Sequence, residues 1–176
     1  MSFLDKKFRD NKGKYALQAF LGGVAVALAL TFFDIVNQPA IIASFGASGV
    51  LAFTIPKRRI SGPRHLIGGY IIGVMVGCTF HFMTIFPLEP YILYKLEHLI
   101  AAAVAVGVTM FLMAITNTEH PPSGGIALGL VINDWTPKTV LLVLVGITLI
   151  SLFQRLLRPY MMDLIESSAT EEYYPG

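Results

Sequence analysis

The chain alternates between long apolar runs and short polar segments. A bilayer core of roughly 30 Å needs about 20 helical residues to cross it, with a range of about 17–25. Four runs reach this length with few or no charged residues, at 16–33, 66–86, 99–118 and, with its flanks, 139–153. The pattern therefore predicts four membrane-spanning helices.

Two further uncharged segments, 39–56 and 121–132, lie between these helices. Each begins near a proline, passes through small Ser and Gly residues and ends in a short aliphatic run. The chain thus follows the order helix, interrupted segment, helix twice. We interpret this order as a weak internal repeat, because the similarity is one of pattern and composition.

The basic residues indicate how often the chain crosses the membrane. Three clusters, within 6–14, 57–64 and 155–158, hold 11 of the 13 Lys and Arg residues. Positive residues collect on the cytoplasmic side, and all three clusters lie there if both interrupted segments cross. We therefore predict an all-α integral membrane protein with two inverted helix–broken helix–helix repeats, six membrane-crossing elements and both termini cytoplasmic. The alternative is four transmembrane helices with two re-entrant segments.

Composition and charge exclude several other classes of protein. Hydrophobic residues make up 55% of the chain and charged residues 14%, against roughly 45–50% and about 25% in soluble domains. Lipid is therefore the expected solvent, and neither disorder nor a soluble enzyme fits. A net charge of +2 is too small for the basic surface of a nucleic-acid-binding domain.

Three short motifs carry a family resemblance. Residues 44–48 read SFGAS, residues 62–69 read GPRHLIGG, and residues 119–125 read EHPPSGG. In this order and among these apolar runs, the motifs resemble the HPP family of integral membrane proteins over roughly residues 15–157. His65 stands where the family usually shows asparagine, and Gly124-Gly125 replaces its more usual glycine-alanine pair. Some members are implicated in nitrite transport, so the resemblance implies that activity here.

The interrupted segments offer a physical route to anion binding. A helix that begins inside the membrane directs unpaired backbone N–H groups and the positive end of its dipole at whatever precedes it. We expect helices to start near 44–47 and 123–125 and to point at one another from opposite sides, with a small anion between them. The candidate pore residues are Ser44, Phe45, Gly46, Ala47, Ser48, His81, His120, Pro121, Pro122, Ser123, Gly124 and Gly125.

Each candidate also has a plain structural interpretation. Gly and Ser residues allow close helix packing, and the spacing of Gly69, Gly73 and Gly77 by four predicts such a packing ridge. His120 either gates the pathway or transfers a proton to a bound weak-acid anion, or it stays neutral and bonds a backbone carbonyl. His81 either reaches the same cavity or meets interfacial water.

No cofactor, metal or catalytic signature is evident. The chain has no phosphate-binding loop or dinucleotide fingerprint, and its four histidines are scattered. We therefore expect neither an enzyme nor a metal protein. We expect one membrane domain over 1–176, with a basic cytoplasmic arm at 1–14, a core at 15–157 and an acidic, disordered tail at 163–176. Without a plastid-type leader, we expect the plasma (inner) membrane of a prokaryote.

These observations give one hypothesis and two alternatives. The hypothesis is a passive or proton-coupled transporter or channel for a small monovalent anion, nitrite first, which works as a homo-oligomer in the lipid bilayer. One alternative is a channel for small neutral solutes. The other is a structural or regulatory membrane subunit that packs against a partner through its glycine ridge.

Overall fold

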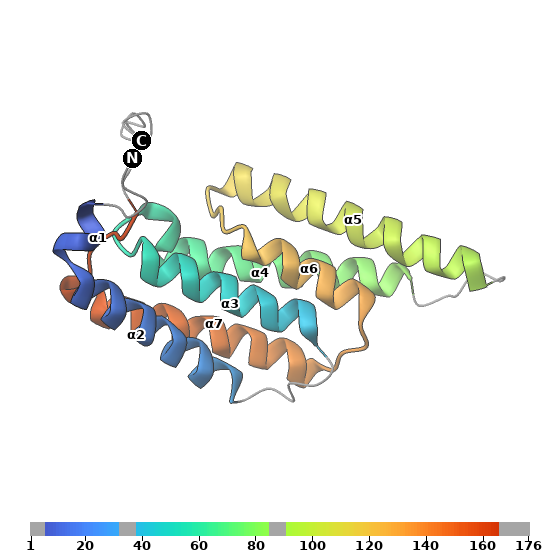
Figure 1. The fold of residues 1–176 in the computed structure, drawn as a ribbon. Helices are drawn as coiled ribbons and strands as arrows, with labels where there is room; N and C mark the ends of the chain where they lie inside the picture. Colours follow the sequence, from blue (N-terminus) through green and yellow to red (C-terminus); the bar gives the residue numbers. More distant parts are fainter. Residues whose placement is uncertain (1–5, 32–37, 85–90, 166–176) are drawn as a thin grey trace.

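The computed structural model describes residues 6–31, 38–84 and 91–165, and among these residues it contains helices and no strand. Figure 1 shows the helices as a bundle. They are α1 (Lys6–Asp10), α2 (Lys12–Leu30), α3 (Pro39–Thr54), α4 (Pro63–Met83), α5 (Tyr91–Thr116), α6 (Pro122–Ile132) and α7 (Pro137–Leu157), with short 3-10 turns η2 (Arg59–Ser61) and η3 (Arg158–Tyr160).

Within the described part of the chain, four helices are long and apolar enough to cross a membrane, as predicted. They are α2, α4, the Leu96–Thr116 part of α5, and α7 with its extension to Tyr160. The two predicted interrupted segments form the shorter apolar helices α3 and α6, of 16 and 11 residues. At about 1.5 Å per residue these are roughly 24 Å and 16 Å long.

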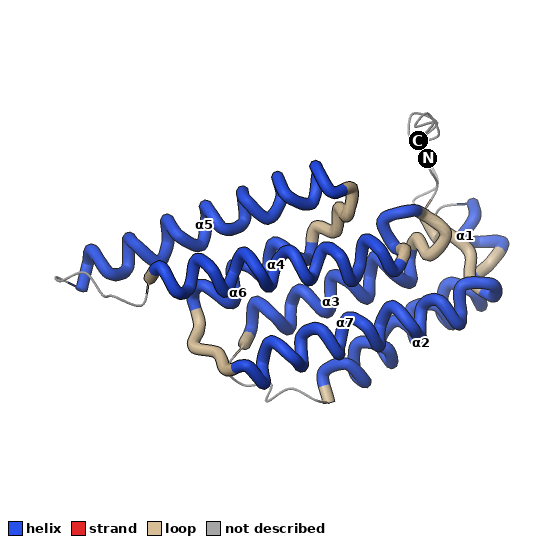
Figure 2. Tube along the Cα trace, turned by 180° about the vertical axis from the view of Figure 1, so that it is seen from behind, coloured by secondary structure: helices blue, strands red, loops and turns tan. Residues whose placement is uncertain are grey.

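Helices α2 to α7 lie side by side, and successive helices run in opposite directions (Figures 1 and 2). The short helix α6 packs against α3, α4 and α5, and α3 also packs against α2 and α7. Helix α5 therefore lies at one edge of the bundle and α2 at the other. Helix α6 is largely buried among its neighbours, whereas α3 keeps one exposed face.

The basic clusters lie at one end of the bundle. Helices α2 and α4 begin there, whereas α3 and α7 end there (Figure 1). Gln18 ties three segments together at this end: its Nε2 donates to the carbonyls of Phe53 (2.8 Å) and Met162 (2.9 Å), and its Oε1 accepts from the Met162 N–H (2.9 Å). We call this the basic end, defined by Lys57 and Arg158, and the opposite one the far end.

A left-handed residue turns the chain back into the bundle after α5. Asn117 has φ of 53°. Its N–H donates to the Ala114 carbonyl (3.3 Å), and the Thr118 N–H donates to the Met113 carbonyl (3.0 Å). These two bonds form a Schellman cap. The chain thus re-enters from the basic end at 117–121 and reaches the far end at the start of α7.

The predicted glycine ridge is confirmed as a packing surface between α4 and α6. A Cβ on Gly73 would lie 2.5 Å from the Ser123 carbonyl oxygen, and one on Gly77 would lie 2.9 Å from that of Ala127. Only glycine permits such an approach of two helix backbones.

One expectation about α3 is wrong. Its helix begins at Pro39 rather than near Ser44. Proline at the first helical position is favourable because its ring fixes φ and its missing N–H is not needed there. Residues 44–47 therefore lie inside a continuous helix, and their amide groups are not helix-terminal donors. Most of the predicted acidic tail, 166–176, lies outside the described residues.

Candidate functional site

Helix α3 directs part of its motif into the bundle. Phe45 and Ser48 are fully buried and Ser44 is 4% exposed, because positions three and four apart share one helix face. Ala47 lies on the exposed face. Gly46 is partly exposed and lines a groove between α2 and α3. The SFGAS motif therefore contributes only Ser44, Phe45 and Ser48 to the interior.

These side chains meet polar groups from two other segments. Ser48 Oγ lies 2.8 Å from the Tyr70 hydroxyl of α4 and 2.8 Å from His120 Nε2, just before α6. Ser48, Tyr70, His120 and Ser123 each have no exposed surface. We call these four residues the polar cluster. Three segments that are distant in sequence thus bring polar groups together inside an apolar bundle.

Two atoms of the polar cluster have no hydrogen-bond partner. They are His120 Nδ1 and Ser123 Oγ, and both are buried. Both residues pack against Gly69, because a Cβ there would lie 2.7 Å from His120 Cβ and 2.8 Å from Ser123 Oγ. The backbone of Ile60, in η2, lies close to the imidazole ring. Unpaired polar atoms are rare inside proteins, and each one calls for an explanation.

The start of α6 does not provide the predicted backbone donors. Pro121 and Pro122 have no N–H group. The Ser123 N–H donates to the His120 carbonyl (2.9 Å), and the Gly124 N–H donates to the Pro121 carbonyl (3.1 Å). At the start of α6, the amide donors are therefore either missing, at the two prolines, or already bonded to backbone carbonyls.

The predicted opposition of two helix N-termini is also wrong. Gln38, the residue before α3, donates from Nε2 to the Asp134 carbonyl (2.9 Å), close to the end of α6. The start of α6, by contrast, lies beside Ser48 in the middle of α3. The two short helices lie alongside one another in opposite directions, so any anion site here depends on side chains.

The remaining predicted residues fall into two groups. Gly125 and Phe45 border the polar cluster: a Cβ on Gly125 would overlap Ser44 Oγ, and the Phe45 ring lies 5.5 Å from the Tyr70 ring. Gly124 faces Val106 of α5, where a Cβ would make ordinary contact at 3.5 Å. Pro122 is buried within α6 and Pro121 is exposed.

His81 lies outside the polar cluster. Its ring packs 5.2 Å from Trp135 and 6.1 Å from Phe82. Because His81 follows Gly69 by 12 residues on the same helix, it lies about 18 Å further along the axis. His81 therefore belongs to an aromatic group towards the far end.

The sequence interpretation missed Tyr70 and the contacts that hold the 117–121 segment. Tyr70 is fully buried, and its signal was a hydroxyl within the apolar run 66–86, next to the glycine ridge. His65 Nδ1 lies 3.2 Å from the Glu119 carbonyl oxygen, and Arg64 donates to the Thr116 carbonyl (3.1 Å). The GPRHLIGG motif thus anchors the segment that carries His120.

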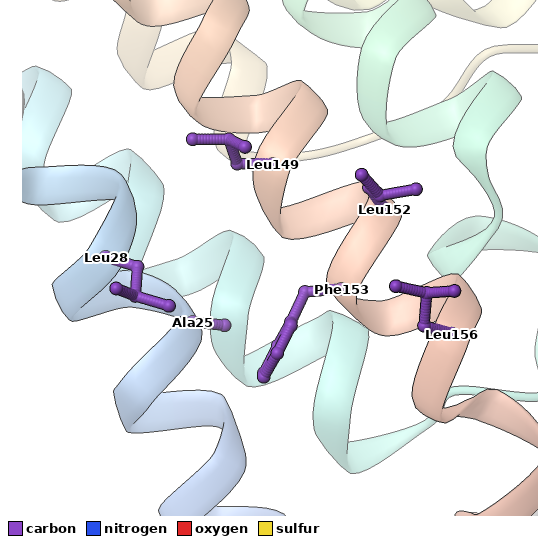
Figure 3. Close-up of a pocket in the computed structure, with 6 residues that line it drawn as sticks. All are labelled: Ala25, Leu28, Leu149, Leu152, Phe153 and Leu156. Atoms are coloured by element: carbon purple, nitrogen blue, oxygen red, sulfur yellow. The ribbon is translucent and has the colours of Figure 1, made fainter.

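Three hollows open on other parts of the bundle. One of about 420 Å³ lies between α2 and α3, and one of about 410 Å³ lies between α4 and α5. A third, of about 260 Å³, lies between α2 and α7 and is lined by six apolar side chains, including Leu28 and Phe153 (Figure 3). None of the three contains a residue of the polar cluster. Within the described residues, no three His, Cys, Asp or Glu side chains are grouped to hold a metal ion.

Comparisons with known proteins agree with a membrane protein. The family model described as the HPP transmembrane region matches residues 9–162. A transmembrane protein of Dictyostelium discoideum is 34% identical over 92 residues, which are 52% of this chain and 30% of that protein. A second transmembrane protein of that organism is 32% identical over 114 residues, 64% and 34% of the two chains. The matches span about a third of each relative, and no solved structure matches the chain.

Proposed function

Because the chain belongs to the HPP family of integral membrane proteins, we propose that it forms a transport pathway for a small monovalent anion. The polar cluster is the observation that carries the proposal. Ionisable and polar residues inside a membrane bundle are unfavourable and generally mark functional sites. Here a histidine and three hydroxyls meet between helices that are otherwise apolar. Nitrite is the first candidate, on the family resemblance alone.

The proposed route enters at the basic end. Gly69 is six residues from the start of α4, so the cluster lies about 9 Å inside that end. Lys57, Arg59 and Arg64 lie there, in the loop before α4 and its first turn, and raise the local concentration of anions. We propose that this end faces the cytoplasm, as the positive-inside rule requires, and that α3 and α6 both cross to give six crossings in two inverted units.

The chemistry of the cluster suits passage rather than tight capture. The polar cluster contains no lysine or arginine, so an anion would be held by hydroxyl and imidazole N–H donors. Conduction requires binding that is favourable enough for entry and weak enough for release. The Tyr70–Ser48–His120 chain of hydrogen bonds also gives a protonated weak acid a partner for proton exchange.

Passage requires the cluster to open, because its four residues have no exposed surface. We propose that the 117–121 segment moves. His65 of α4 contacts the Glu119 carbonyl within this segment, and Arg64 donates to the carbonyl of Thr116, the residue just before it. The segment ends at two prolines, so it cannot simply extend α6 backwards.

We propose a homo-oligomer as the functional unit. Helix α5 packs against α4 and α6 only on one side, and large apolar side chains, including Phe111 and Ile115, are exposed on it. We propose the plasma membrane of a prokaryote as its location. The two relatives come from a eukaryote.

The test is solute flux into liposomes that contain the purified full chain, with insertion verified. Nitrite, urea and methylammonium represent an anion, a neutral solute and a cation. The proposal predicts nitrite influx above that of protein-free liposomes, and methylammonium influx equal to theirs. Nitrite influx at the protein-free rate would contradict it. Influx of urea with no current and no response to membrane potential would favour a neutral-solute channel.

The second candidate function is that of a structural membrane subunit. The closed polar cluster favours it. The glycine ridge, however, packs against α6 within the same chain, so the expected contact of a partner with this ridge is wrong and a partner would bind another surface. A subunit of this kind predicts no flux of any of the three solutes, together with co-purification of a partner from detergent-solubilised membranes.

A further inference from the structure

Tyr70 is joined to His120 through Ser48 by a chain of two hydrogen bonds. Its hydroxyl contacts Ser48 Oγ, and Ser48 Oγ contacts His120 Nε2, each at 2.8 Å. A neutral imidazole has one N–H donor and one bare acceptor nitrogen, and the hydrogen bonds around it decide which nitrogen is which. Which atom donates in each of the two bonds, here called their order, therefore decides whether the other ring nitrogen, Nδ1, carries a proton.

Three orders use both bonds, because a serine oxygen can accept two hydrogen bonds. In the first, Tyr70 donates to Ser48, Ser48 donates to His120 Nε2, and the His120 proton is on Nδ1. This order leaves one donor without a partner, the Nδ1–H. In the second, His120 Nε2–H donates to Ser48 and Ser48 donates to Tyr70. That order leaves two groups unpaired, the Tyr70 hydroxyl hydrogen and the bare Nδ1.

In the third order, Tyr70 and His120 Nε2–H both donate to Ser48, which leaves the Ser48 hydroxyl hydrogen and the bare Nδ1 unpaired. Among the described residues, Ser48 has no further acceptor that would rescue this order. Its Oγ bonds Tyr70 and His120 and makes no bond to the carbonyl four residues back, unlike Ser44, which donates to the Ala40 carbonyl at 2.8 Å. Buried unpaired groups are unfavourable in proportion to their number. The first order is therefore the stable one.

We propose that Tyr70 is a positioning residue that fixes His120 as the Nδ1–H tautomer, so that the ring offers a donor within the polar cluster. A donor at this position selects solutes that accept hydrogen bonds, such as small anions, over cations that can only donate. The tautomer follows from the hydrogen bonds alone, whereas the selectivity rests on the proposed function. The cluster thereby gains a preference for anions from a neutral side chain.

The test is ¹⁵N NMR of the full chain in lipid bilayers with ¹⁵N-labelled histidine. Four histidines are present, and the signal lost in His120→Gln identifies His120. The wild-type protein is expected to show a protonated Nδ1 and a bare Nε2. In Tyr70→Phe, Ser48 can turn to its own helix, and the Nε2–H fraction is expected to rise at least tenfold. Tyr160→Phe, at a tyrosine that is 83% exposed, is the matched control and keeps the wild-type signal.

Flux separates this inference from the proposed function. Tyr70→Phe is expected to lower nitrite influx several-fold, and Tyr160→Phe to leave it unchanged. A wild-type His120 protonated on Nε2 overturns the inference, even if Tyr70→Phe fails to fold. A changed tautomer with unchanged influx overturns the selectivity role. The expected tautomer in a protein without nitrite influx supports the positioning role and contradicts the proposed function.

Discussion

At the scale of single residues, spacing predicted packing better than it predicted the site. The four-residue spacing of Gly69, Gly73 and Gly77 identified a real helix contact, because a spacing of four places all three residues on one helix face. The donors at residues 44–47 were predicted wrongly, because Pro39 was taken as part of an interruption, whereas it is the first residue of the helix. Tyr70 was missed because one hydroxyl in an apolar run resembles an ordinary buried aromatic.

The glycine ridge gives a test with a matched control. Gly73→Ala would place a Cβ 2.5 Å from the Ser123 carbonyl oxygen, whereas Gly107→Ala in α5 would meet nothing within 4 Å. We expect Gly73→Ala to lower the free energy of unfolding by about 1–3 kcal/mol through overpacking. Gly107→Ala should leave it unchanged or raise it, because alanine favours helix. Thermal unfolding in detergent measures both, and equal midpoints would contradict the ridge.

At the scale of elements, hydropathy predicted the four long helices because a membrane fixes their length. It could not fix the ends or directions of α3 and α6, because those depend on neighbours: α6 is enclosed by α3, α4 and α5. The turn by which the chain returns after α5 was not predicted either. It depends on the left-handed Asn117, and asparagine adopts that conformation only in particular local contexts.

The cap at Asn117 can be tested with one pair of substitutions. Asn117→Val places a β-branched residue at φ of 53° and should lower the free energy of unfolding by about 1–2 kcal/mol, the cost of the left-handed conformation. Asn117→Gly should be tolerated, because glycine has no Cβ to clash. Unfolding of purified variants in detergent gives the comparison. A valine variant as stable as the glycine variant would show that the cap does not hold the 117–121 segment.

At the scale of the whole molecule, the bundle brings the basic clusters to one end and encloses the polar groups. That arrangement predicts sidedness in a membrane. In a Cys78→Ser background, Arg59→Cys and Tyr160→Cys should react with an impermeant thiol reagent from one side, and Lys138→Cys from the other. If α3 and α6 were re-entrant, Arg59→Cys would react from the Lys138 side, and the six-crossing arrangement would be wrong.

The most direct test of the polar cluster as part of an anion route is nitrite influx through a matched pair of serine variants. Ser123 and Ser151 are both buried, in α6 and α7, and only Ser123 belongs to the cluster. Ser123→Ala should reduce influx about tenfold, since a hydrogen bond to a charged group contributes roughly 1.5–3 kcal/mol. Ser151→Ala should keep the wild-type rate. Equal rates for the two variants would contradict the account.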